Sequence, residues 1–217
     1  MYEPEYYDKR FKWREEQRLN LVSKLNIKPG KLLDIGCATG QFMRGMNHNG
    51  WEVTGIDMNK KYIDYAKSLG LNANVQKLES IRTVDKYGLI TMMQVFEHLK
   101  NPAEVLKIVK GLMDTKGYMV IEVPNANALT NIYYRLFKPN KLIEYQFSVG
   151  HQHLFTKRDI SKLIQGSGFR ITQLRTVTYK DTESFKINIR VKIGYWVRRS
   201  ITWLNFGELI WVVATKR

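Results

Sequence analysis

Short apolar runs alternate along the first 125 residues with segments whose apolar side chains recur every three or four positions. The runs predict strands and the periodic segments predict helices. We expect strands over residues 31–35, 51–56, 74–76, 87–93 and 118–123, and helices over residues 10–25, 41–49, 59–69 and 102–112. Strands that alternate with helices are joined by right-handed crossovers. The order therefore predicts an α/β fold with a doubly wound, mostly parallel sheet and helices on both faces.

This alternation stops after Pro124, where residues 125–150 form an insertion rich in aromatic and basic side chains. Thr156, followed three residues later by Asp159, predicts the start of a helix that ends at Ser167-Gly168. Residues 169–179 and 208–215 predict two more strands, which brings the sheet to seven. Between them, residues 185–193 alternate like a strand and residues 195–204 have a helical pattern, so the structure of this segment stays open.

Charge is distributed unevenly along the chain. The formal net charge is +15, and residues 130–217 hold 16 Lys and Arg against 5 Asp and Glu. A positive field of this kind attracts anionic partners, such as phosphorylated or carboxylated small molecules, acidic lipids or nucleic acid. General solubility is the alternative explanation.

Two features of the sequence predict a cytoplasmic protein. The longest apolar stretch is far shorter than the roughly 18 residues of a membrane span, and the first residues lack the charged and apolar regions of a signal peptide. Cys37 is the only cysteine, so the chain cannot form an internal disulfide.

The segment most informative about chemistry is the loop Asp34-Ile-Gly36-Cys37-Ala38-Thr-Gly40, which follows the first expected strand. Doubly wound folds bind their ligands at this end of the strands. A dinucleotide loop needs Gly-x-Gly-x-x-Gly, whereas here an aspartate precedes two glycines that are four residues apart. A carboxylate in this place repels a diphosphate and suits a ligand that carries an ammonium group.

This loop resembles the first motif of the class I S-adenosylmethionine-dependent methyltransferases, Asp/Glu-x-Gly-x-Gly-x-Gly, with Ala38 in place of the middle glycine. Gly55-Ile-Asp57 resembles the second motif, whose acid binds both ribose hydroxyls. The resemblance implies a Rossmann-like fold and S-adenosyl-L-methionine as the cofactor. It also implies cofactor contacts at the matching positions, which are Asp34, Gly36, Cys37, Ala38, Gly40, Asp57, Met58 against the adenine, Gln76, Lys77 and Leu78 near the adenine edge, and Gln94 near the methionine portion.

Within that superfamily, the chain resembles the branch of the ubiquinone-biosynthesis O-methyltransferases and of natural-product, sugar and lipid tailoring methyltransferases. The segments that carry this resemblance are Tyr6-Tyr7-Asp8, Glu97-His98-Leu99-Lys-Asn-Pro102, His153-Leu-Phe155-Thr156 and Gly166-Ser-Gly168-Phe169. These segments are common to enzymes with many substrates, so they identify a branch and not a reaction. We expect methyl transfer to a small acceptor at oxygen, and the positive charge predicts that this acceptor is anionic or lipid-linked.

The length of 217 residues fits one domain. In that domain we expect an N-terminal helix or lid (1–28), a cofactor-binding half (31–123), an acceptor-side insertion (125–150) and a basic insertion between the last two strands (180–206). Tyr6, Tyr7 and Trp13 either close over the cofactor or pack the N-terminal helix.

An oxygen acceptor has to lose a proton, and imidazole accepts one near neutral pH. His98, His151 and His153 are the candidates, because the family places both of their segments on the acceptor side of the cofactor; the alternative is a structural role. Glu97 and His98 together suggest a divalent metal, but adjacent side chains diverge and no spaced third ligand is evident, so we expect no metal. Cys37 is expected to pack in the loop rather than to act as a nucleophile.

Two other function classes compete with a small-molecule methyltransferase. An RNA methyltransferase would use the basic, aromatic C-terminal part, but the Asn/Asp-Pro-Pro-Tyr motif is replaced by Gln94-Val-Phe-Glu97, so we do not expect nucleic acid as a partner. A non-catalytic module would dock on a partner or on an acidic membrane, and the preserved cofactor motifs argue against it. Peripheral contact with the inner face of an acidic membrane is compatible with either class, through Lys186, Arg190, Lys192, Arg198 and Arg199.

Overall fold

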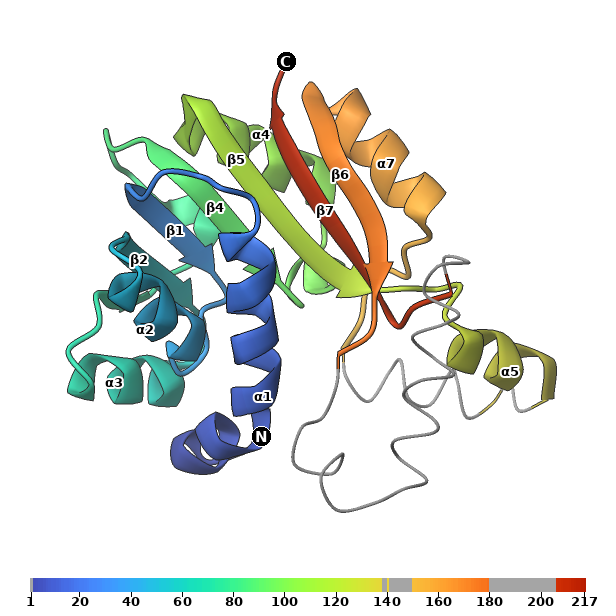
Figure 1. The fold of residues 1–217 in the computed structure, drawn as a ribbon, viewed down its shortest axis with the longest axis horizontal. Helices are drawn as coiled ribbons and strands as arrows, with labels where there is room; N and C mark the ends of the chain where they lie inside the picture. Colours follow the sequence, from blue (N-terminus) through green and yellow to red (C-terminus); the bar gives the residue numbers. More distant parts are fainter. Residues whose placement is uncertain (1, 138–139, 141–149, 180–205) are drawn as a thin grey trace. The chain divides into compact units, whose positions relative to one another are not determined.

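A computed structural model of the chain describes residues 2–137, 140, 150–179 and 206–217. It contains a seven-stranded sheet with the order β3-β2-β1-β4-β5-β7-β6 (Figure 1). The strands are β1 (Lys31–Ile35), β2 (Glu52–Asp57), β3 (Ala73–Val75), β4 (Tyr87–Met93), β5 (Met113–Pro124), β6 (Phe169–Val177) and β7 (Leu209–Lys216). β1 and β3 each pair with β2 in parallel, whereas β6 and β7 pair antiparallel. The predicted seven strands are confirmed.

The helices in the described part of the chain are α1 (Pro4–Ser23), α2 (Gln41–His48), α3 (Lys60–Ser68), α4 (Pro102–Leu112), α5 (Leu129–Phe137) and α7 (Lys157–Gly166). Most helices lie within one or two residues of the predicted ranges, and the larger differences concern α1, α5 and the strand β5. α1 begins six residues before the expected helix, at a proline, which is well suited to the first helical turn. α5 replaces the first part of the irregular insertion, and β5 begins five residues before the expected strand. The remainder of the 125–150 insertion and nearly all of the basic 180–206 insertion lie outside the described residues.

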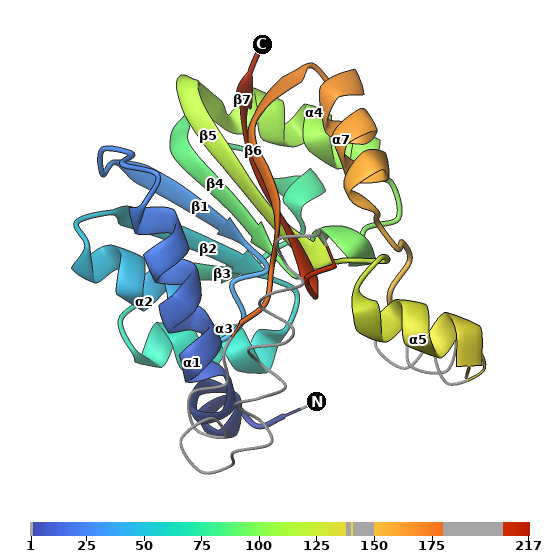
Figure 2. The same ribbon diagram turned by 45° about the vertical axis from the view of Figure 1, so that its right-hand side comes forward.

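Two compact units account for most of the contacts, and the first is built mainly from Met1–Thr91 and Ile108–Tyr118. Its core contains Leu32 and Leu33 of β1, Met43 of α2 and Ile63 of α3, all at most 1% exposed. α1 lies against α2 and α3 (Figure 2). Gly45 of α2 lies against α1, and a Cβ there would lie 2.8 Å from Leu19 Cδ2, so the Leu19 side chain would have to move.

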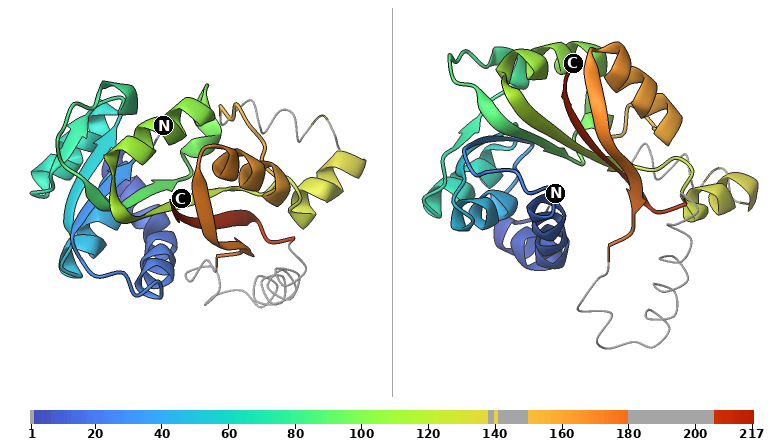
Figure 3. Two further views of the ribbon diagram at one scale, coloured as in Figure 1. Left: turned by 90° about the horizontal axis from the view of Figure 1, so that it is seen from above. Right: turned by 45° about the horizontal axis from the view of Figure 1, so that its top comes forward.

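The second unit is built mainly from Met92–Lys107, Met119–Thr178 and the C-terminal strand. α7 lies along β6 (Figure 3). The buried side chains of this unit include Ile160, Phe169 and Trp211. The predicted capping box is confirmed: Asp159 N donates to Thr156 Oγ1, and Thr156 N donates back to the Asp159 carboxylate, both at 3.2 Å. No helix in the described residues combines the length and apolar character that a bilayer crossing demands.

Candidate active site

The loop after β1 is held in a conformation that only a few residue types adopt easily. Gly36, Ala38 and Gly40 have φ values of 75°, 47° and 78°. Gly36 N and Cys37 N both donate to Ile56 O of β2, at 2.7 and 3.1 Å. This pair of hydrogen bonds to the neighbouring strand fixes the start of the loop. Ala38 keeps the left-handed conformation despite its Cβ, at a cost of about 1–2 kcal/mol.

Asp57, at the end of β2, is a carboxylate oriented by backbone donors on both sides. Ala38 N donates to Oδ2 at 3.0 Å, and Asn59 N donates to Oδ1 at 2.8 Å. Each carboxylate oxygen can accept two hydrogen bonds, so with respect to the described residues both oxygens retain a lone pair for a ligand. The side chain is half-buried and the adjacent Met58 is 59% exposed. The two residues predicted to contact the cofactor therefore follow one another at the end of β2, and both are accessible to a ligand.

Asp34 lies at the end of β1 and is only 3% exposed. Thr91 Oγ1 donates to its Oδ1 at 2.6 Å. Burial raises the pKa of Asp34 to about 7, and the hydrogen bond from Thr91 opposes that rise. The ionised carboxylate is therefore costly in the folded protein, and a cation placed beside it would recover part of that cost.

We expect Asp34→Asn to stabilise the fold increasingly as the pH rises. Between about pH 4 and pH 7 the unfolded chain releases the Asp34 proton while the folded chain keeps it, which lowers the free energy of unfolding. Between pH 5 and pH 8 this loss amounts to about 2–3 kcal/mol, and asparagine does not titrate. Thermal unfolding of both proteins at the two pH values measures it. A stability difference that is the same at pH 5 and pH 8 would contradict the prediction.

Asp8 of α1 contacts the same loop, a role that the sequence did not reveal. Thr39 Oγ1 donates to Asp8 Oδ1 at 2.7 Å, and Gln41 Nε2 donates to Asp8 O at 2.7 Å. Arg44 lies 3.4 Å from the other carboxylate oxygen. In the sequence, Tyr6-Tyr7-Asp8 indicates only a resemblance to the branch, and the wide separation of Asp8 and Thr39 along the chain hides their contact.

Other residues predicted to contact the cofactor lie in the loop after β1 and in the segment after β3, and they differ in exposure. Cys37 is 5% exposed, and burial raises the pKa of its thiol far above neutrality, so packing rather than nucleophilic attack suits it. Leu78 is 5% exposed, whereas Lys77 lies at the surface. Gln76 N donates to Asp57 O at 3.1 Å, which holds this segment beside β2.

The N-terminal aromatic residues pack against α3. The rings of Tyr7 and Tyr62 lie 5.1 Å apart, and Tyr62 Oη donates to Tyr2 O at 3.2 Å. Tyr6 is 53% exposed and its ring lies 5.1 Å from that of Tyr2. Trp13 lies farther along α1, half-buried. Tyr7 thus packs against the first unit, and closure of these aromatic residues over the cofactor stays a prediction.

In the second unit, Gln94 is strained and incompletely satisfied. Its φ is 60°, and its backbone N donates to Glu122 O at 2.8 Å. Within the described residues, its buried Nε2 has no hydrogen-bond partner. Backbone strain together with an unsatisfied buried donor is typical of ligand-binding positions. The family resemblance implies that this residue lies near the methionine portion of the cofactor, and the geometry of Gln94 is compatible with a ligand-binding role.

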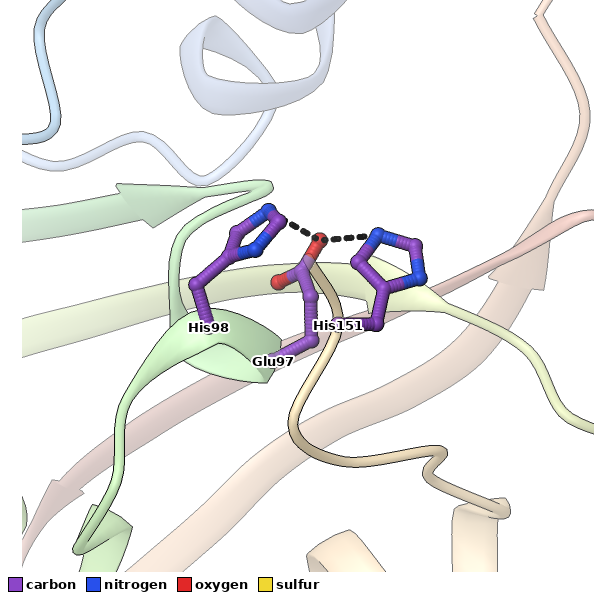
Figure 4. A group of neighbouring side chains, drawn as sticks. All are labelled: Glu97, His98 and His151. Carbon is purple, nitrogen blue, oxygen red and sulfur yellow. Dashed lines mark ion pairs between the residues drawn. The ribbon is translucent and has the colours of Figure 1, made fainter. Parts of the chain in front are cut away.

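Glu97, His98 and His151 come together although His151 lies far along the chain from the other two (Figure 4). The Nε2 atoms of His98 and His151 lie 4.0 and 3.9 Å from Glu97 Oε1. Glu97 is 1% exposed, while the His98 side chain is 39% exposed. Burial, followed by the proximity of His98, lowers the pKa of His151, so its imidazole is neutral at pH 7. No third ligand for Glu97 and His98 is evident in the sequence, and in the structure His151 takes that position.

His153 is engaged differently from the other two histidines. Its Nε2 donates to Leu99 O at 2.9 Å, and its ring lies 5.6 Å from that of Phe155. Gln152 N and His153 N both donate to Glu97 O, at 2.9 and 3.0 Å. These bonds attach residues 151–153 to the turn after β4, so His153 has a visible structural role.

Known proteins resemble this chain in sequence and in fold. A family model described as a methyltransferase domain matches residues 7–174. A ubiquinone biosynthesis O-methyltransferase of Aeromonas salmonicida is 26% identical over 179 residues, which is 77% of this chain and 74% of that protein. Among solved structures, an S-adenosylmethionine-dependent methyltransferase of Archaeoglobus fulgidus has a TM-score of 0.66 at 20% identity, and the match covers 97% of this chain and 99% of the other.

A second solved structure carries the cofactor. The magnesium protoporphyrin IX methyltransferase of Synechocystis, solved with bound S-adenosylmethionine, has a TM-score of 0.60 at 14% identity; the match covers 94% of this chain and 78% of the other. The two structural matches share the fold, and the family model spans most of the chain. The chain belongs to the class I S-adenosylmethionine-dependent methyltransferases.

Proposed function

We propose that this methyltransferase transfers the methyl group of S-adenosylmethionine to an oxygen atom of a small acceptor that is anionic or lipid-linked. The observation that carries cofactor binding is the Asp57 carboxylate, which two backbone donors orient while both oxygens keep a free lone pair. Transfer to oxygen is supported by the similarity to a ubiquinone biosynthesis O-methyltransferase over 77% of the chain. The anionic character of the acceptor is supported by the basic C-terminal part.

The residues of the first unit fit the cofactor in size and charge. Asp57 would accept hydrogen bonds from both ribose hydroxyls, and the exposed Met58 would cover the adenine. Asp34 would face the ammonium group, whose positive charge offsets the cost of a buried carboxylate. Gly40 keeps the loop in this conformation, since its φ of 78° and the neighbouring Ala66 Cβ disfavour a larger residue.

In methyl transfer the protein mainly positions the two reactants and excludes water, because the sulfonium of the cofactor supplies the reactivity. A hydroxyl acceptor also has to lose its proton. His98 offers a suitable nitrogen: its Nδ1 donates to Gly150 O at 3.1 Å, so the lone pair of the neutral ring is on Nε2. In His153 the Nε2 proton is directed at Leu99 O. His151, whose Nε2 faces Glu97, is the third candidate.

Labelled S-adenosylmethionine offered with a panel of acceptors tests the proposal. The panel contains phenols and carboxylated phenols, sugar nucleotides, lipid-linked saccharides, amines and RNA. We expect label in a methyl ether of an anionic or lipid-linked hydroxyl compound. Exclusive methylation of amines or of RNA would replace the proposed acceptor class, and cofactor binding without transfer to any hydroxyl would refute it.

We further propose that the protein is cytoplasmic and contacts the inner face of an acidic membrane through its basic insertion, residues 180–206. Most of this insertion lies outside the described residues, so its charge alone supports the proposal. Attraction to an acidic surface is worth about 1 kcal/mol per Lys or Arg near it. We expect cosedimentation with anionic but not neutral vesicles at low salt. This cosedimentation should be lost when the charge is reversed at five residues of the insertion: Lys186, Arg190, Lys192, Arg198 and Arg199.

Vesicle binding has a matched control in Lys60, an exposed basic residue of the first unit. Reversing the charge at Lys60 should leave cosedimentation unchanged. Equal sedimentation with neutral and anionic vesicles, or none with either, would mean that the positive charge serves solubility and not membrane binding.

A further inference from the structure

The Glu97–His98–His151 cluster has the composition of a metal site. Each side chain offers one ligand atom, and these atoms all lie within 4.8 Å of one another. The two imidazoles and the carboxylate point toward one another from two separate segments of the chain (Figure 4). We propose that Glu97, His98 and His151 bind a divalent transition-metal ion such as Zn²⁺.

The spacing of the atoms suits an ion between them. The distances from Glu97 Oε1 to the two Nε2 atoms, 4.0 and 3.9 Å, are too long for hydrogen bonds. A tetrahedral ion with bonds of about 2.0–2.1 Å holds its ligand atoms about 3.3 Å apart. The side chains would therefore close by roughly 1 Å around the ion, which small rotations of the side chains allow.

The hydrogen bond of His98 favours a ligating role. A backbone carbonyl only accepts, so the bond from Nδ1 to Gly150 O fixes the proton on Nδ1 and leaves the Nε2 lone pair facing Glu97. Metal-binding histidines characteristically donate their other ring N–H to a carbonyl or carboxylate. His98 thus already has the tautomer and the outer partner of a metal ligand.

The backbone under the cluster is fixed before any ion binds. Glu97 O accepts from both Gln152 N and His153 N, and Phe155 O accepts from Ala126 N at 2.9 Å. The rings of Phe96 and Phe155 pack 5.6 Å apart beneath this segment. Supported in this way, His151 is held against Glu97 by the fold and needs no large rearrangement to ligate.

The donor set selects the class of metal. Two imidazole nitrogens and one carboxylate favour Zn²⁺, Co²⁺, Ni²⁺ or Fe²⁺ over Mg²⁺ and Ca²⁺, which prefer oxygen donors throughout. Three protein ligands leave at least one position for water or for an oxygen of the substrate. The 39% exposure of the His98 side chain leaves a side of the cluster open to such a ligand.

The role of this ion in catalysis rests on the proposed function. A hydroxyl group of the acceptor bound to the ion would have a lowered pKa and release its proton to solvent. Its oxygen would then attack the methyl carbon of the sulfonium, the carbon–sulfur bond would break with its electron pair going to sulfur, and S-adenosylhomocysteine would leave. This assigns to the metal the proton loss that free histidines would otherwise assist.

Direct titration of the metal-free protein with ZnCl₂ by calorimetry tests the site, and Co²⁺ provides a visible spectrum of the bound ion. We expect one ion per chain in the wild type. The loss in affinity for Glu97→Gln and His151→Ala should exceed about 100-fold, because even outer-shell partners cost about 10–100-fold. His48→Ala removes an exposed histidine of α2 outside the cluster and should bind as the wild type does. If Glu97→Gln fails to fold, the more exposed His98→Ala gives the same test.

Two further results distinguish this inference from the proposed function. Zinc binding that is equal in the wild type and in His151→Ala, or that is undetectable in the wild type, overturns the metal site even when S-adenosylmethionine binds normally. Zinc binding that requires the three residues supports it even when the acceptor panel yields no methylated hydroxyl compound.

Discussion

Replacing Asp57 by alanine is expected to weaken the binding of S-adenosylmethionine by about 100- to 10,000-fold. A hydrogen bond to a charged group contributes about 1.5–3 kcal/mol, and the carboxylate is positioned to accept two from the ribose. The variant also releases Ala38 N and Asn59 N, which the carboxylate now holds at 3.0 and 2.8 Å. Calorimetric titration with the cofactor measures the loss.

Asp64 provides the matched control for Asp57. It lies in α3 of the same unit, is exposed, and forms a surface ion pair with Lys60 at 2.5 Å. Because such pairs contribute about 0–1 kcal/mol, Asp64→Ala should leave cofactor affinity unchanged. If Asp57→Ala bound the cofactor as tightly as Asp64→Ala does, the assignment of Asp57 to the ribose would be wrong.

Gly40→Ala is expected to destabilise the fold by about 2–5 kcal/mol and to weaken cofactor binding, because the cofactor loop would have to shift. The residue has a φ of 78°, where a Cβ costs about 1–2 kcal/mol. The same Cβ would overlap with Leu71 Cδ1 and lie 3.3 Å from Ala66 Cβ, and overpacking of this kind costs about 1–3 kcal/mol. Urea unfolding and cofactor titration report the two effects.

Gly70 separates these two causes. Its φ of 77° is nearly that of Gly40, but nothing lies within 4 Å of a Cβ placed there. Gly70→Ala should therefore show the backbone cost alone and bind the cofactor normally. Equal destabilisation by the two substitutions would mean that the contacts with Leu71 and Ala66 relax without cost.

Most of the fold could be predicted because its elements are local patterns. The boundaries of β1 and β4 agree with the expected ranges to the residue, since each is a mainly apolar segment that begins after a turn signal or a polar residue and ends at a glycine or a polar residue. α5 was missed because its aromatic and basic residues resemble an irregular insertion, and none of its side chains is buried. Its helical pattern presents no core face that would reveal it.

The loop glycines and Asp57 could be found in the sequence because they lie close together along the chain and form recognisable motifs. Contacts over long sequence distances left no comparable signal. The pairing of Asp8 with Thr39 and the arrival of His151 beside Glu97 both depend on how the chain returns to an earlier segment. No local pattern around His151 assigns its partner, so only the folded backbone reveals the cluster.

The hydrogen bond between Asp8 and Thr39 connects the N-terminal helix to the cofactor loop. If the bound loop favours this hydrogen bond, then docking of the helix strengthens cofactor binding, and by reciprocity the cofactor stabilises the docked helix by the same free energy. The first turns of α1 would then tune affinity without touching the ligand. Their amide hydrogens, measured by exchange, would report on occupancy of a site that is built from later parts of the chain.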